Sequence, residues 1–187
     1  MATRDSFRAM RNQQSGFTLV ELVVTMTVAV ILVSLAVPSF RSLLANRTVQ
    51  SAADTLASDF RFARSEAIKR TSKVTICASG NGSTCTGSGA LWRNGWIVFV
   101  PTASDGSFTS GDEIIRVQDA IGSIASIAAT DGTSKFQFVF EATGWSQAAA
   151  QQFLVTPSGG SGATARVVCI SNKGRPAIRA KGETTCT

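Results

Sequence analysis

A long apolar run close to the N-terminus constrains this chain more than any other feature. The run extends from Phe17 to Val37, and its polar side chains are the hydroxyls of Thr18, Thr25, Thr27 and Ser34 and one acid, Glu21. Its length matches the ~20 residues that an α-helix needs to span a bilayer. A carboxylate inside a membrane costs ~2.5 to 3.5 kcal/mol on insertion scales, so Glu21 requires a partner.

The residues before the run suggest where that partner comes from. A secretory signal peptide runs from basic to apolar to a small-residue cleavage site, whereas here Gly16 stands in front of the apolar run. Cleavage after Gly16 would remove residues 1–16, keep the apolar segment and create a new ammonium group at Phe17, one helical turn from Glu21. Three cations precede the run and, by the positive-inside rule, place the N-terminus in the cytoplasm: Arg4, Arg8 and Arg11.

The junction SGFTLVELVV resembles the class III leader junction of type IV prepilins and type II secretion pseudopilins. The resemblance implies that a prepilin peptidase in the membrane cuts after Gly16 and methylates the new N-terminus at Phe17. It also implies that Glu21 neutralises the N-terminal amine of a neighbouring subunit during assembly, and that Pro38 bends the helix where it leaves the membrane. A plain signal anchor or an uncleaved signal peptide explains neither the position of the glycine nor that of the acid.

The segment after the run has helical periodicity. Apolar residues recur at steps of three and four, at Val49, Ala52 or Ala53, Leu56, Phe60, Ala63 and Ala67. Joined to the apolar run, this predicts one helix of roughly 50 residues, or ~80 Å. These apolar residues form one stripe along the helix, and we expect this stripe to pack on the chain's own sheet rather than to bind a cofactor.

The pattern changes to strands after Ser72. Runs rich in β-branched and aromatic residues occupy 73–79, 96–100, 113–118, 123–129, 135–140, 152–156 and 166–171. Turn dipeptides such as Asn94-Gly95 and Asp105-Gly106 separate them. The prediction is an α+β fold in which a long N-terminal helix packs on an antiparallel sheet.

Four cysteines follow the apolar run, at Cys77, Cys85, Cys169 and Cys186. Three disulfide pairings are possible, and local closure favours Cys77 with Cys85 and Cys169 with Cys186. A zinc site is the alternative, but the paired short CxxC spacings that zinc modules favour are absent.

Nothing in the sequence points to an enzyme, a cofactor or a resident metal. The chain has no histidine, which excludes Ser-His-Asp and Cys-His catalytic arrangements. The pair Asp112-Glu113 reads as a solvated turn at the start of a strand. Calcium binding there is the alternative, although the acids do not alternate as they do in an EF-hand loop.

Three segments of the exported part, FRFARSEAIKRTSKVTIC, WRNGWIVFV and GDEIIRVQ, resemble the FimT/FimU-type minor pilins of the GspH/FimT family. The resemblance implies the type IV pilin fold and a role in a tip complex with other minor and major pilins, which helps to prime fibre assembly at the inner-membrane platform. It also implies four regions: a leader (1–16), a transmembrane half-helix (17–38), an amphipathic half-helix (39–72) and a β-rich head (73–187). The head would lie in the periplasm and later at the pilus tip. A type II secretion pseudopilin is the alternative.

The resemblance implies a third possibility, a DNA receptor for natural transformation, because one subgroup of the family is implicated in DNA uptake, and the charge distribution bears on this role. Residues 17–165 contain ten Lys and Arg against ten Asp and Glu, whereas the tail from Arg166 onward has five cations against Glu183. Cations on a closed loop neutralise phosphates regardless of base sequence. The resemblance implies a Gly-Arg-x-Arg motif in DNA-binding relatives, but here the second arginine is displaced, and no aromatic residue lies between Lys173 and Lys181. The candidate DNA-binding residues are Lys173, Arg175, Arg179 and Lys181. The alternatives are a basic edge that serves solubility and a surface that meets an acidic neighbouring minor pilin.

Overall fold

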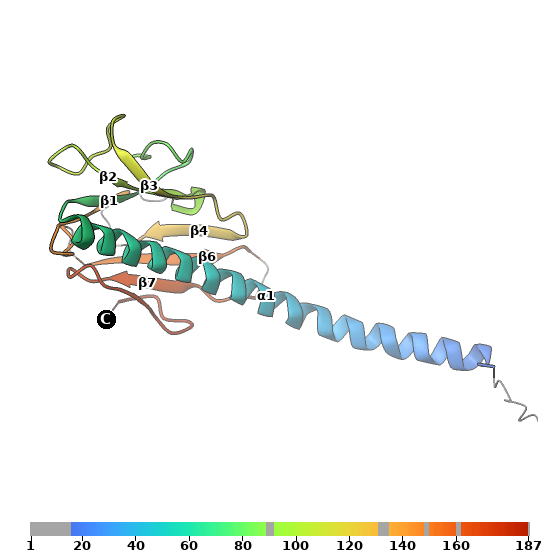
Figure 1. Ribbon diagram of the computed structural model, residues 1–187. Coiled ribbons are helices and arrows are strands. Elements are labelled where there is room, and N and C mark those ends of the chain that lie inside the picture. The colour runs from blue at the N-terminus through green and yellow to red at the C-terminus, as the bar shows by residue number, and fades with distance from the viewer. Residues whose placement is uncertain (1–15, 89–91, 131–134, 148–149, 160–161, 187) are drawn as a thin grey trace, which may run out of the picture. The chain divides into compact units, whose positions relative to one another are not determined.

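The computed structural model describes residues 16–88, 92–130, 135–147, 150–159 and 162–186. The chain divides into two compact units, Met1–Ser39 and Phe40–Thr187. One α-helix, α1 (Leu19–Arg70), contributes to both. The head, which here means the second unit, contains all of the described strands (Figure 1).

Both ends of α1 have a local cause. The hydroxyl of Thr18 accepts a hydrogen bond from the backbone N–H of Glu21 at 3.2 Å, which is the geometry of an N-cap. At the other end Thr71 takes a left-handed conformation with φ of 49°. The N–H groups of Thr71 and Ser72 then bond back to the carbonyls of Ile68 and Ala67, which forms a Schellman motif. The helix therefore ends at Arg70.

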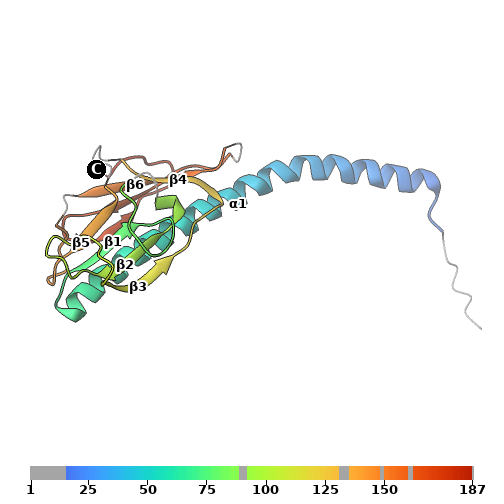
Figure 2. The same ribbon diagram turned by 90° about the horizontal axis from the view of Figure 1, so that it is seen from above.

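The head has eight strands among the described residues. They are β1 (Val74–Ala78), β2 (Trp96–Val100), β3 (Glu113–Gln118), β4 (Ile124–Ala129), β5 (Gln137–Phe140), β6 (Gln151–Pro157), β7 (Arg166–Ile170) and β8 (Pro176–Ile178), with a short 3₁₀ helix η1 (Trp92–Asn94) before β2. All pairings are antiparallel, which confirms the predicted α+β fold. The strands are divided between two sheets, of order β3-β2-β1-β5 and β4-β6-β7-β8. Figure 2 labels the four strands of the first sheet and β4 and β6 of the second.

The stripe on α1 supplies one side of a core that both sheets share. Every residue of the predicted stripe is buried, together with Ala57. Phe60 lies at the centre, with its ring centroid 5.1 Å from that of Phe138 on β5 and 5.4 Å from that of Phe153 on β6. The helix therefore joins two sheets that share no ladder among the described residues.

A buried carboxylate on α1 ties the helix to the first sheet. Asp59 is 4% exposed; it accepts a hydrogen bond from the indole N–H of Trp96 at 2.8 Å and forms an ion pair with Arg116 of β3. The guanidinium of Arg116 also lies 3.8 Å from the centroid of the Phe62 ring. The carboxylate thus has the partners that a buried charge requires.

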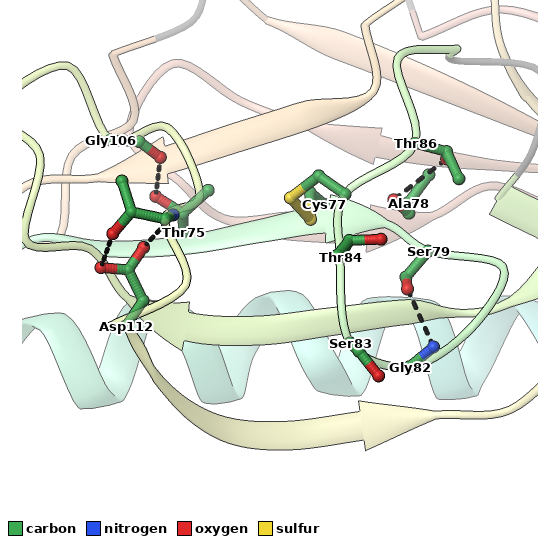
Figure 3. Close-up of a disulfide and its surroundings, with 12 residues drawn as sticks. Thr75, Cys77, Ala78, Ser79, Gly82, Ser83, Thr84, Thr86, Gly106 and Asp112 are labelled. Carbon is green, nitrogen blue, oxygen red and sulfur yellow. Dashed lines mark hydrogen bonds between the residues drawn. A yellow bond between two sulfur atoms is a disulfide. The ribbon is translucent and has the colours of Figure 1, made fainter.

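Two disulfides close the loops of the head. Cys77 pairs with Cys85 and Cys169 with Cys186, with Cα atoms 5.6 Å and 5.7 Å apart, which is the pairing that local closure favoured. Figure 3 shows the first of them, between β1 and the loop that follows it. One disulfide therefore lies on each sheet.

Asp112 fixes the loop before β3, as Figure 3 also shows. Its carboxylate accepts hydrogen bonds from the backbone N–H and the hydroxyl of both Thr102 and Thr109. Desolvation raises the pKa of Asp112, but these hydrogen bonds outweigh it and hold the pKa below its ordinary value. The carboxylate oxygens of Asp112, which calcium binding at this turn would require, are thus hydrogen-bonded to donors of the loop itself.

Candidate functional site

The apolar segment of α1 displays its side chains outward. The large apolar residues from Leu19 to Val37 are exposed, and α1 is the one helix in the described part of the chain that is long and apolar enough to cross a membrane. The hydroxyls of this segment donate hydrogen bonds to backbone carbonyls of the same helix. Thr25 donates to the carbonyl of Leu22 at 2.9 Å, and Thr27 donates to that of Val23 at 2.7 Å. These groups therefore tolerate an apolar solvent without outside partners.

Glu21 is the exception within this segment. It lies in the first turn of α1, and its carboxylate has no hydrogen bond or ion pair with any residue that the structure describes. Phe17, the predicted site of methylation, is exposed next to the cap residue Thr18. The geometry thus leaves one acid, without a partner of its own, four residues after the predicted new N-terminus.

The rest of the predicted junction lies at or beyond the edge of the described residues. Gly16 is described and exposed, whereas Arg4, Arg8 and Arg11 lie outside the described residues. Pro38 lies inside α1. Because proline has no backbone N–H, it removes the helical hydrogen bond to the carbonyl of Ser34.

A second candidate site is the basic edge, defined here as Lys173, Arg175, Arg179 and Lys181 around strand β8. Cys169 of β7 is opposite Ala177 of β8. The pairing continues beyond β8, because the N–H of Ser171 donates a hydrogen bond to the carbonyl of Arg175 at 3.0 Å. At the other end the N–H of Arg179 bonds to the carbonyl of Val167, also at 3.0 Å. The sequence did not predict β8, because a three-residue run that begins with proline is a weak strand signal.

This ladder aligns the two arginines. Each arginine lies two positions from Ala177, and alternate residues of an extended chain share a face. Arg175 and Arg179 therefore project from one side of the sheet, with their Cα atoms about 13 Å apart. They line a cavity of about 370 Å³ together with Gln152 and the disulfide of Cys169 and Cys186. Lys173 and Lys181 lie in the turns on either side and are exposed.

An aromatic residue that sequence reasoning missed lies beside this edge. Trp145 is 53% exposed, and the ammonium group of Lys173 lies 6.0 Å from its ring centroid. The two residues come from different turns, so their proximity has no signal in local sequence. The residues that the structure describes contain no group of three or more acids or cysteines placed to hold a metal ion.

These features fit a class of protein, the pilin-like membrane subunits. The family model described as type II transport protein GspH matches residues 52–174, and the model for the prokaryotic N-terminal methylation motif matches residues 11–37. The chain belongs to the GspH family, the minor pilins and pseudopilins that the head motifs indicated. A comparison with curated proteins finds no match.

The solved structures show the same fold. The chain is similar to the type IV minor pilin FimU of Pseudomonas aeruginosa in two crystal forms, at 24% sequence identity in each. One alignment has a TM-score of 0.54 and covers 71% of this chain and 88% of that one, and the other has a TM-score of 0.51 and covers 70% and 92%. The predicted type IV pilin fold is confirmed. Pilins are structural proteins, and the methylation motif with the apolar helix indicates a membrane anchor with a periplasmic head.

Proposed function

We propose that this chain is a minor pilin that joins a tip complex with other minor pilins and helps to prime pilus assembly. Glu21 is the observation that supports this most directly. It is a charged group in an apolar segment whose hydroxyls are all satisfied within the helix or its cap, and its carboxylate has no partner in the described chain. A partner from a second subunit, the methylated amine at Phe17, removes the cost of burying this acid.

The proposal includes the processing and the topology. A prepilin peptidase cuts after Gly16, residues 17–38 hold the chain in the inner membrane, and the assembly platform moves it into a fibre. Residues 39–72 form the amphipathic half-helix, and residues 73–187 form the β-rich part of the head. Family membership alone fits a type II secretion pseudopilin equally well, so the test has to separate these two roles.

The test is a strain that lacks this chain. We expect most surface pili to be lost, because nucleation of the fibre requires the tip complex, while the secretion of type II substrates is unchanged. Pili in sheared fractions and secreted enzyme activities in the medium are measured side by side, with a strain complemented by the wild-type chain as the control. Normal piliation with lost secretion would assign the chain to a secretion machine instead.

A second candidate function, a DNA receptor at the pilus tip, is supported by the shared face of Arg175 and Arg179. Two arginines whose Cα atoms lie about 13 Å apart on a disulfide-closed edge can contact two phosphates of one strand. Displacement of the second arginine from the Gly-Arg-x-Arg spacing preserves this face, because a shift of two residues along an extended chain returns to the same side.

We expect the double variant Arg175→Ala with Arg179→Ala to bind duplex DNA more weakly and with a smaller salt dependence. Loss of two phosphate contacts lowers the slope of log affinity against log salt by about 2. Gel shifts of the processed full chain in neutral detergent at several salt concentrations measure this slope. The matched control, Arg41→Ala with Arg61→Ala, removes the same charge from exposed positions of α1. Equal slopes in the two double variants would contradict the DNA role.

A further inference from the structure

The exposure of Trp145 sets it apart from the other tryptophans. Trp92 and Trp96 are fully buried in the core, and the indole N–H of each donates a hydrogen bond, to the carbonyl of Lys135 and to Asp59. Trp145 is 53% exposed. A large apolar ring that a fold leaves in water, beside cations, is a candidate for ligand contact.

The turn that presents this indole is held firmly. The N–H of Gly144 bonds to the carbonyl of Glu141 at 2.7 Å, and the N–H of Glu141 bonds to the carbonyl of Trp145 at 2.8 Å. Gly144 has a φ of +77°, and a Cβ there would lie 2.6 Å from the side chain of Ile68 on α1. The turn therefore packs directly on the last turns of the helix, and its shape depends on the glycine.

A second turn brings cations to the same surface. The N–H of Ser146 bonds to the carbonyl of Asn172 at 3.2 Å, and Gly174 packs so closely that a Cβ would lie 2.7 Å from the carbonyl oxygen of Gly144. This contact places Lys173 beside the indole, and Arg175 follows in the same turn. None of the ion pairs among the described residues involves either of these two cations.

The nearby groups favour an anionic ligand. Arg64 of α1 donates from Nε to the carbonyl of Gly144 at 3.0 Å, which adds a third cation to this surface. The acid of the turn, Glu141, already forms an ion pair with Lys73 at 3.6 Å and a hydrogen bond with Gln147. The surface around Trp145 thus combines a half-exposed indole ring with excess positive charge.

We propose that Trp145 and Lys173 form a stacking site for an unpaired base of single-stranded nucleic acid, with the phosphates on Lys173 and Arg175. This inference rests on the candidate DNA role of the basic edge. Single-stranded sites combine a cationic track with aromatic rings on which bases stack, and every base has a π face. In a duplex these faces are covered by neighbouring bases, so Trp145 contributes to the binding of single strands alone.

Tryptophan fluorescence tests the site directly, because Trp145 is the exposed one of three tryptophans. The processed full chain in neutral detergent is titrated with a twelve-nucleotide oligothymidylate and with a twelve-base-pair duplex. We expect the single strand to quench the emission of Trp145 and the duplex to leave it nearly unchanged. Trp145→Ala should lose about 5- to 150-fold in affinity for the single strand, and none for the duplex. Trp145→Phe, which keeps a ring, should retain most of the affinity.

The outcomes separate this site from the DNA role itself. If Trp145→Ala binds both nucleic acids as the wild type does, the DNA role stands and the stacking site is overturned. If the wild type binds neither nucleic acid, both fail. If polyglutamate competes as well as the oligothymidylate and depends equally on Trp145, the surface binds an acidic protein partner, and the stacking site is again overturned.

Discussion

The variant Glu21→Gln is expected to be cleaved and methylated normally yet to be nearly absent from fibres. The change removes the negative charge and keeps the size, so a neighbouring N-terminal ammonium loses its partner inside the membrane. Removal of one partner from a buried ion pair costs about 3 to 5 kcal/mol, which corresponds to a loss of incorporation of at least 100-fold. The amount of this chain in sheared pili, relative to the membrane fraction, measures the effect.

Two checks accompany that experiment. The mass of the membrane-extracted variant should correspond to a chain that begins at Phe17; an intact Met1 would contradict the predicted processing. Asp54→Asn removes one negative charge from an exposed position of the same helix, outside the apolar segment, and should incorporate normally. If Glu21→Gln enters fibres as well as Asp54→Asn does, the charge pairing is wrong.

The variant Phe60→Ala should destabilise the head more than any exposed substitution on α1. The ring contacts aromatic side chains from both sheets and is fully buried, so its removal leaves a cavity that neither sheet can fill alone. Phe→Ala changes in cores cost about 3 to 5 kcal/mol. For a domain of this size that corresponds to a fall in Tm of roughly 10 °C.

Near-ultraviolet circular dichroism of the oxidised chain in detergent monitors this unfolding through the buried Trp92 and Trp96. Phe40→Ala is the matched control, since it removes the same ring from a position of α1 that is 60% exposed. A Tm for Phe60→Ala no lower than that of Phe40→Ala would show that the core does not depend on Phe60.

Features encoded by local periodicity were predictable from the sequence. Residues three and four apart share a face of a helix, and the predicted stripe from Val49 to Ala67 is the buried one. Branched and aromatic runs gave the positions of β1 to β7 to within two residues, because each run is bounded by turn residues. The family followed from the glycine junction and the tryptophan segment, and the family models bear it out.

Features that depend on contacts between distant segments were not predictable. The division into two sheets depends on which strands pair, and β8 is paired with β7 despite its proline. Asp59 gives no sign in the sequence that it is buried with Trp96 and Arg116. The dipeptide Asn94-Gly95 predicts a turn, but a Cβ at Gly95 would also lie 2.3 Å from the carbonyl oxygen of Gln118, so close packing of β3 against this turn requires the glycine as well.

The continuity of α1 has a mechanical consequence. In a head joined to its anchor by a separate linker, tension would act first on the residues at the surface where the linker is attached. Here the helix that carries the apolar segment also carries Phe60, so tension on the anchor passes along the backbone of one helix into the core of the head. Extraction of the anchored helix from the head would expose its whole buried stripe at once. Tension on the apolar segment is therefore opposed by the cooperative unfolding of the whole head.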